Sequence, residues 1–254
     1  MRRIFTVALV FGAMMLFAAS NCVAQSVFEK HKADFDYDKS QPLNPEVKVL
    51  EERENYVKYH VFYNSANGER VPAFLYVPKN IKKYAEGLSE EYRKGYDRRA
   101  IEQNGPPWPV IFFMHWLQSD KSLADGFAPK WALYGYAVLA IDGIHKGERE
   151  KPGRNILEFN PNDTRQNIVQ QVIDSRRGLD YLASRPDIDM KRCAYFGISM
   201  GSLTGAVATA VDDRFKVVVL ADGAGDLATV FNKAELPEFK ETVNKIQDLG
   251  YTLD

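Results

Sequence analysis

The chain has 254 residues, of which 45% are hydrophobic and 26% are charged, and its formal net charge is −1 at pH 7. These values are ordinary for a single globular domain, and the chain has neither an internal repeat nor a low-complexity tract. It lacks the basic excess that nucleic-acid-binding domains carry, so no nucleic-acid partner is expected.

Residues 1–24 have the pattern of a secretory signal peptide. Arg2 and Arg3 form a short basic start, an apolar run follows, and small residues end the segment, so cleavage is expected after Ala24. The apolar run is shorter than the roughly 20 residues that a spanning helix needs, which makes a membrane anchor the weaker alternative. The mature chain is therefore expected to be secreted or periplasmic, without membrane contact.

Signal cleavage also changes the charge and the cysteine content. It removes Arg2 and Arg3 and no acidic residue, which moves the formal net charge from −1 to −3. It removes Cys22 and leaves Cys193, so no internal disulfide is expected. Cys193 lies in the apolar run RCAYFG and is predicted to be a small buried side chain.

Residues 25–46 are a polar lead-in, and residues 47–254 form the predicted domain. The domain begins with strand-like segments over residues 47–52, 56–63 and 70–78, and Asn67-Gly68 is expected to make the turn between the last two. This opening predicts an antiparallel hairpin or meander. Residues 81–105 are strongly charged and indicate a solvent-exposed helical excursion, with a substrate-facing lid as the alternative.

From residue 110 onward, buried strands alternate with helices. A long helix is expected from about Asp163 to Ser184, ending at Arg185-Pro186. Strands that are apolar on both faces and joined by helices indicate an α/β fold with a mostly parallel sheet covered on both sides. The predicted strands are VIFFMH (110–115), AVLAID (137–142), RCAYFG (192–197) and FKVVVLAD (215–222).

The stretch YFGISMGSLTG places Ser199 between Gly197 and Gly201, in the pattern G-x-S-x-G. It lies directly after a predicted strand and directly before a helix of small residues, which is the context of a nucleophile elbow. Glycines at positions 197 and 201 permit a sharp turn, which exposes the serine side chain at the apex of the turn. Ser199 is therefore the candidate nucleophile, and a purely structural serine turn is the alternative.

On these residues the sequence resembles the α/β-hydrolase superfamily, and within it the dienelactone hydrolase and acetyl-xylan esterase-like group. The resemblance covers roughly Val57 to Asp226. It implies an α/β-hydrolase fold with an N-terminal antiparallel hairpin. Its pieces stand in the expected order: VPAFLYVPKN, VIFFMHWLQSDK, YGYAVLAIDGIHKGER, DSRRGLDYLASRPDIDMKRCAYFGISMGS and DDRFKVVVLADG.

The resemblance also implies an oxyanion hole made of two backbone N–H groups. The first belongs to Met200, which follows the nucleophile, and the second is assigned to Leu117 in the loop after His115-Trp116. Trp116 stands where the superfamily usually has glycine, so the path of this loop is expected to differ. His115 is predicted to brace the loop rather than to act as a base.

A histidine base is missing from the expected place. In this superfamily the chain order is serine, acid, histidine, yet the four histidines, His31, His60, His115 and His145, all precede Ser199. Three explanations are open. His145 serves as the base in place of the missing histidine, the protein binds a ligand without catalysing a reaction, or the chain is a truncated copy of a longer enzyme. The third is favoured because FKVVVLAD reads as an interior strand, and no strand pattern follows it to cover its far edge.

The candidate acid within the chain is Asp222, with loop capping as its alternative role. Asp142 is expected to be structural, and Glu148 and Arg149 to form a local ion pair or to line the pocket. The sequence thus predicts an exported serine hydrolase of small-molecule or carbohydrate esters. The alternatives are a non-catalytic binding protein and a serine peptidase of the same fold. No metal or cofactor is expected.

Overall fold

The computed structural model describes residues 29–86, 89, 105–158 and 160–223. The predicted signal peptide, most of the charged stretch 81–105, and residues 224–254 lie outside this part. The chain divides into two compact units, residues 1–37 and 38–254. In the first unit the described structure is helical and includes η1 (Ala33–Phe35). The second unit holds the sheet, and no helix of the described part is long and apolar enough to cross a bilayer.

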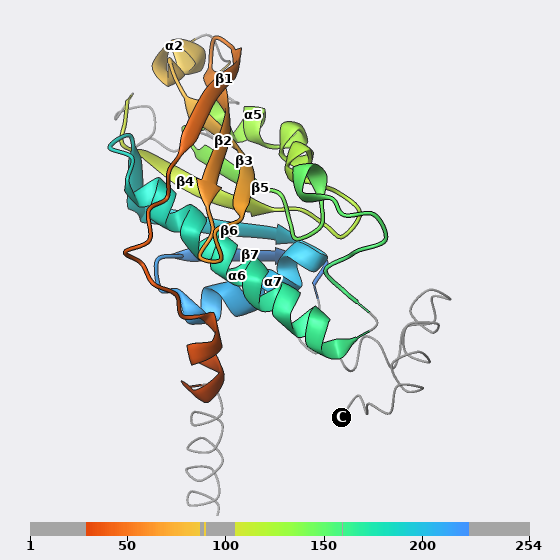
Figure 1. Cartoon of the computed structure of the whole chain (residues 1–254). Helices are drawn as coiled ribbons and strands as arrows, with labels where there is room; N and C mark the ends of the chain where they lie inside the picture. Colours follow the sequence, from red (N-terminus) through yellow and green to blue (C-terminus); the bar gives the residue numbers. More distant parts are fainter. Residues whose placement is uncertain (1–28, 87–88, 90–104, 159, 224–254) are drawn as a thin grey trace, which may run out of the picture. The chain divides into compact units, whose positions relative to one another are not determined.

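The described strands form one seven-stranded sheet in the order β1-β2-β3-β5-β4-β6-β7 (Figure 1). Strands β1, β2, β3 and β5 pair antiparallel, while β5, β4, β6 and β7 pair parallel. The predicted N-terminal meander and parallel sheet are therefore confirmed. The strands are β1 (Glu46–Glu52), β2 (Tyr56–Asn64), β3 (Arg70–Pro78), β4 (Trp108–Met114), β5 (Ala137–Ile141), β6 (Ile188–Ile198) and β7 (Val217–Ala221).

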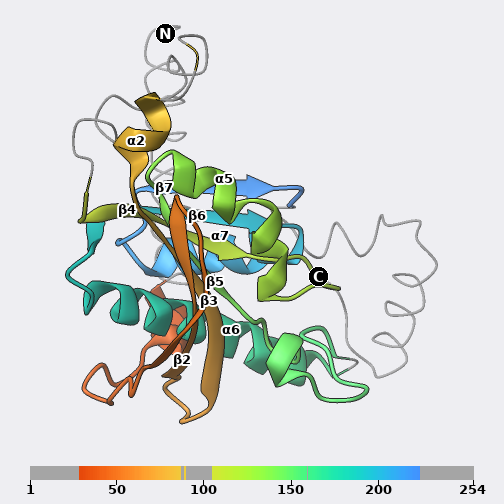
Figure 2. The same ribbon diagram turned by 90° about the horizontal axis from the view of Figure 1, so that it is seen from above.

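Helices cover both faces of the sheet, as the sequence predicts. Helices α6 and α7 lie on one face and α5 on the other (Figure 2). The larger apolar cluster includes Leu179 and Leu182 of α6, and the smaller one includes Ala128 and Ala132 of α5. The helical segments are α2 (Ile81–Glu86), η2 (Lys121–Gly126), α5 (Ala128–Leu133), η3 (Gly147–Arg149), α6 (Pro161–Ala183) and α7 (Met200–Val211).

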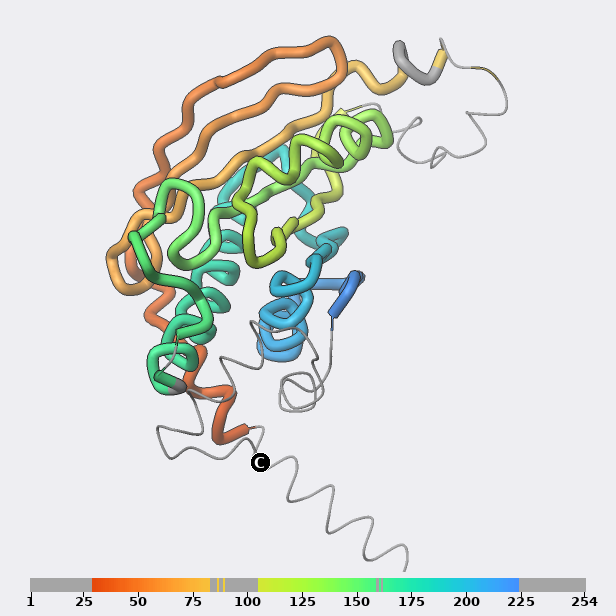
Figure 3. Tube along the Cα trace, turned by 90° about the vertical axis from the view of Figure 1, so that its right-hand side faces the viewer, coloured from red at the N-terminus to blue at the C-terminus, as the bar shows by residue number. Residues whose placement is uncertain are grey.

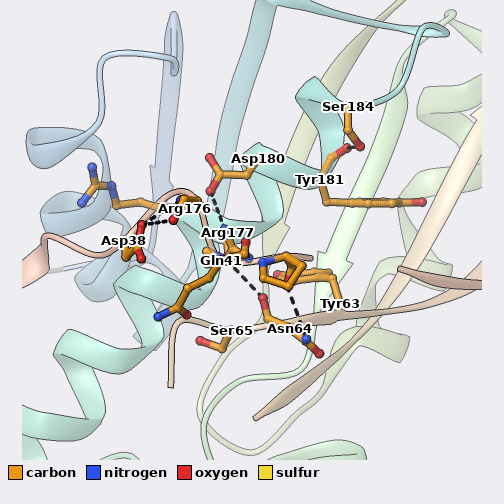
Figure 4. Close-up of polar contacts among 12 residues, drawn as sticks. Asp38, Gln41, Tyr63, Asn64, Ser65, Arg176, Arg177, Asp180, Tyr181 and Ser184 are labelled. Atoms are coloured by element: carbon orange, nitrogen blue, oxygen red, sulfur yellow. Dashed lines mark hydrogen bonds and ion pairs between the residues drawn. The ribbon is translucent and has the colours of Figure 1, made fainter. Parts of the chain in front are cut away.

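Buried Arg177 of α6 fastens the chain that leads into β1 (Figure 4). Its guanidinium donates to the backbone oxygens of Gln41 at 2.9 Å and Asn64 at 3.2 Å, and it pairs with Asp180 at 3.3 Å. The Arg177 side chain is 1% exposed, so an unpaired charge there would be costly. These bonds hold the end of the polar lead-in against β2 and α6.

Strand β7 lies at the end of the described sheet, beside α7 (Figure 3). Within the described residues it pairs with β6 alone. Residues Val217–Leu220 are between 42% and 59% exposed, although the sequence VVVL is that of an interior strand. The apolar side chains of β7 are therefore open to solvent in the described part of the chain.

Candidate active site

Ser199 forms the turn between β6 and α7. Its backbone has φ 52° and ψ −111°, a region that residues other than glycine rarely adopt, and the residue is half-buried. A Cβ atom at Gly197 would overlap the carbonyl group of Gly201, and one at Gly201 would overlap the carbonyl oxygen of Met114. The two glycines of the pattern are thus required by close backbone approach, and the predicted strand–turn–helix context is present.

Hydrogen bonds on both sides hold the turn in place. The Ser199 N–H donates to the Ala221 oxygen of β7 at 2.9 Å, and the Ser199 oxygen accepts from the Ser202 N–H at 2.8 Å. The structure gives Ser199 Oγ no hydrogen-bond partner among the described residues. The hydroxyl therefore lies at the carboxyl end of β6 without being used in holding the turn together.

Ser202 ties the turn to two strands, which the sequence pattern did not predict. Its hydroxyl lies 2.8 Å from the Gly197 oxygen of β6 and 2.6 Å from the Ala221 oxygen of β7. The Tyr195 hydroxyl donates to the Gly201 oxygen at 2.7 Å. Both side chains are buried, so they fix the first turn of α7 against the sheet.

The two predicted oxyanion donors meet at one narrow pocket. Leu117, from the loop after β4, and Met200, the first residue of α7, both line it. Within the described residues neither backbone N–H group has a hydrogen-bond acceptor. Trp116 also lines this pocket and is 37% exposed. Leu117 and Met200 therefore line one space beside the Ser199 turn, and Ser199 itself is not among the residues that line it.

His115 braces the loop after β4, as the sequence predicts. Its Nδ1 lies 2.6 Å from the Trp116 oxygen, and the Gly143 N–H donates to its Nε2 at 2.9 Å. A carbonyl oxygen only accepts, so Nδ1 carries the hydrogen and the ring is neutral. With both ring nitrogens used in bridging the loops after β4 and β5, His115 is not available as a base.

The burial of His115 predicts a pH dependence of stability. Desolvation lowers the pKa of His115 below its usual value of about 6.5. A lowered folded-state pKa means that the unfolded chain binds more protons, so the free energy of unfolding should fall as the pH drops below about 6.5.

His115→Gln is expected to flatten this slope between pH 7 and 5 by at most about 1.4 kcal/mol per pH unit. Urea denaturation at each pH measures it, with Glu29→Gln, an exposed change in the same chain, as the control. An unchanged slope in His115→Gln would show that another group titrates there.

The other described histidines have no hydrogen bond to Ser199. His60 Nε2 pairs with Glu148 Oε1 at 2.7 Å, and His31 lies 3.3 Å from Asp34. His145 lines a second cavity and has a positive φ of 59°. No described histidine is hydrogen-bonded to Ser199.

A buried ion pair joins the loops after β4 and β5. Lys121 Nζ lies 2.8 Å from Asp142 Oδ2, and the two side chains are 5% and 0% exposed. Asp142 also accepts from the backbone N–H groups of Lys121 and Glu148 at 3.0 and 2.9 Å. The structural role predicted for Asp142 fits these contacts.

Glu148 and Arg149 do not form the local ion pair that was one of their predicted roles. Glu148 instead pairs with Lys121 at 2.6 Å, and Arg149 pairs with Asp174 at 2.6 Å. The reason is that each side chain reaches a buried charge brought close by the fold. Both residues line the second cavity, and neither lines the pocket at Leu117 and Met200.

Asp222 follows β7 directly, at the same edge of the sheet as Ser199. It is exposed and has a positive φ of 53°. Because Ile198 and Ala221 are paired in the β6–β7 register, Asp222 and Ser199 continue neighbouring strands. The described residues hold no group of three or more His, Cys, Asp or Glu side chains suited to a metal ion. Cys193 is 1% exposed, and burial raises the pKa of its thiol to about 12.

Comparisons with known proteins agree with this architecture. Residues 128–251 match the sequence profile of the prolyl oligopeptidase family (peptidase S9). The chain is 28% identical over 184 residues to YtaP of Bacillus subtilis (strain 168), a protein named as a hydrolase. The aligned part covers 70% of the chain and 57% of YtaP.

Two solved structures share the fold. An acetyl xylan esterase from Paenibacillus sp. R4 has a TM-score of 0.63 at 19% identity, covering 87% of this chain and 66% of that one. Acetyl xylan esterase 1 from Thermoanaerobacterium sp. JW/SL YS485 has a TM-score of 0.62 at 15% identity, covering 88% and 65%. The chain thus spans somewhat more than half of YtaP and about two thirds of each esterase.

Proposed function

We propose that this chain, which has the α/β-hydrolase fold, is an exported serine hydrolase of carboxylic esters with Ser199 as its nucleophile. The observation that carries the proposal is the backbone of Ser199, held at a positive φ between β6 and α7 with a hydroxyl that the turn does not use. Backbone strain of this kind is found where a side chain must be presented to a substrate.

In the proposed reaction, Ser199 Oγ attacks the acyl carbon and the N–H groups of Met200 and Leu117 stabilise the resulting oxyanion. Each such donor typically contributes about 10²–10³-fold in rate. Collapse of the tetrahedral intermediate releases the alcohol and leaves an acyl-serine, which water then hydrolyses. A histidine takes the proton from Ser199 and gives it to the leaving alcohol.

The base is not assigned to any of the four histidines of this sequence, because His31, His60 and His115 have other partners and His145 lies at another cavity. Asp222 is the candidate acid within the described part, since it stands at the same sheet edge as Ser199. The signal peptide predicted over residues 1–24 supports export.

The proposed substrate is an acylated carbohydrate or another small ester. Support comes from the two acetyl xylan esterases that share the fold. The match of residues 128–251 to the prolyl oligopeptidase family favours a second candidate, a serine peptidase using the same Ser199. The two are distinguished by offering the protein acetylated xylo-oligosaccharides and proline-containing peptide amides in parallel.

A fluorophosphonate probe tests the nucleophile. Applied to the full product of the gene, it is expected to add one phosphonyl group to Ser199, located by mass spectrometry of the digested protein. Ser199→Ala should remain unlabelled, whereas a control, Ser119→Ala, should label normally. Labelling of another serine, or none on the folded protein, would reject Ser199 as a nucleophile.

A further inference from the structure

Gln171 is a buried amide near the candidate oxyanion donors, and the reaction proposed above gives it no role. It lies near the middle of α6, is 0% exposed, and lines the narrow pocket together with Leu117 and Met200. Buried amides in native proteins form hydrogen bonds, because an unpaired amide loses its contacts with water and gains nothing in return. The contacts of Gln171 therefore show which parts of the site it holds.

The side chain of Gln171 joins α6 to the loop after β5 and to the end of β4. Its Oε1 accepts from the Ile144 N–H at 2.8 Å. Its Nε2 lies 3.7 Å from Met114 Sδ, which is a weaker contact because a thioether sulfur is a weak acceptor. The Met114 carbonyl oxygen is the atom that a Cβ at Gly201 would overlap. Gln171 therefore contacts β4 where that strand packs against the Ser199 turn.

The bond to Ile144 is the first step of a relay of hydrogen bonds that ends at Trp116. Gly143, which precedes Ile144, donates its N–H to His115 Nε2 at 2.9 Å. His115 Nδ1 carries the hydrogen and donates it to the Trp116 oxygen at 2.6 Å. Gly143 lies so close to the ring that an added Cβ would be 3.1 Å from two ring atoms of His115. The relay thus runs from Gln171 through the loop after β5 to the loop after β4.

The Trp116 oxygen and the Leu117 N–H belong to the same peptide group. That group is planar and trans, so its oxygen and its N–H point in opposite directions. A hydrogen bond that fixes the direction of the Trp116 oxygen therefore also fixes the direction of the Leu117 N–H. The Ser119 N–H also donates to the Trp116 oxygen, at 3.2 Å. The relay thus ends at one of the two predicted oxyanion donors.

We propose that Gln171 is a positioning residue of the ester site and that it orients the Leu117 N–H through His115. This assignment rests on the ester hydrolase function proposed above, since Leu117 has no catalytic role without it. Gln171 does not touch the substrate, but it keeps the loop after β5 where Gly143 can bond to His115. An oxyanion donor contributes only when it points at the developing charge, so a broken relay should slow the reaction without preventing substrate binding.

Gln171→Leu tests the relay, and Gln170→Leu is its matched control. Both variants remove a side-chain amide from α6, and Gln170 gives up hydrogen bonds to Ser65 at 2.8 Å and Asp174 at 2.7 Å, which are not part of the relay. The measurement is the rate constant with which a fluorophosphonate labels Ser199 in the full gene product, because this reaction also develops negative charge on an oxygen. Gln171→Leu should lower the rate constant by about 10- to 100-fold, and Gln170→Leu by about threefold at most.

Ester hydrolysis and a conservative variant separate positioning from a general loss of structure. Gln171→Leu should lower kcat for a small ester by about 10- to 100-fold and leave KM within about threefold of the parent. Gln171→Glu keeps an oxygen that can accept from the Ile144 N–H, so its kcat should stay within about threefold of the parent. Because a buried carboxyl group is costly, Gln171→Glu should nevertheless unfold at a lower urea concentration than the parent.

A double variant tests whether Gln171 acts through His115. His115→Phe removes both ring nitrogens and so breaks the relay at a later step. Adding Gln171→Leu to His115→Phe should change kcat by less than about threefold, because both substitutions remove the same control over the Leu117 N–H.

Three results would overturn the proposal while Ser199 of the parent is labelled. They are equal rate constants in Gln171→Leu and Gln170→Leu, kcat values of the Gln171 variants that fall in step with their urea midpoints, and a full further loss when Gln171→Leu is added to His115→Phe. Absence of Ser199 labelling in the parent is a different result. It would reject the hydrolase function, and the role of Gln171 with it.

Discussion

Ser199→Ala is expected to lower kcat for ester hydrolysis by the full gene product by about 10⁴–10⁶-fold, the range that removal of a serine nucleophile gives in other hydrolases. The fold should survive, because the contacts that hold the turn are made by the Ser199 backbone and by Ser202 and Tyr195. Hydrolysis of an acetylated xylo-oligosaccharide measures the loss. Activity within tenfold of the parent would contradict the assignment.

Ser199→Gly separates the catalytic role from the backbone strain. A non-glycine residue at φ 52° and ψ −111° costs about 1–3 kcal/mol. Glycine relieves that strain but loses about 0.4–1 kcal/mol through the greater freedom of the unfolded chain. Ser199→Gly should therefore be about 1 kcal/mol more stable to urea than Ser199→Ala, and equally inactive. Equal stability of the two variants would indicate that the turn is unstrained.

The elements that the sequence predicted best are those in which a local pattern decides the structure. The apolar run 137–142 became β5 within one residue, and the small-residue run after Ser199 became α7. Boundaries shifted where polar residues extend an element. β6 begins at Ile188, four residues before the apolar run, because Ile188 pairs with Trp108 across an irregular register.

The candidate site was predictable in part for the same reason. The spacing of Gly197, Ser199 and Gly201 is a local signal. In the structure a side chain at either glycine would overlap backbone atoms of another residue. The partners of Ser202, Arg149 and Asp142 were not predictable, because each contact joins segments far apart in the sequence. Arg149 and Asp174, for example, meet only once the loop after β5 packs on α6.

Those long-range contacts explain how the site keeps its shape. The loop after β4 has little regular structure, so other parts of the chain must fix Leu117. His115 links it to Gly143, and Asp142 links it to Lys121 at the start of η2. Both links run to the loop after β5. The shape of the proposed ester site therefore depends on bonds between the loops after β4 and β5.

Asp142→Ala is expected to lower the free energy of unfolding by about 3–5 kcal/mol, the range found when one partner of a buried ion pair is removed. Lys121 would keep a charge at a 5% exposed side chain, and two backbone N–H groups would lose their acceptor. Burial alone would lower the pKa of Lys121, but the Asp142 and Glu148 carboxylates outweigh it and raise that pKa.

Glu148→Gln is the matched control, because Glu148 pairs with the same Lys121 but its side chain is 41% exposed. Exposed pairs contribute about 0–1 kcal/mol, so this variant should stay within about 1 kcal/mol of the parent in urea denaturation. Lys121→Met combined with Asp142→Asn should cost less than the sum of the single changes, since no unpaired buried charge remains. If Asp142→Ala costs no more than Glu148→Gln, the pair is not what holds the two loops together.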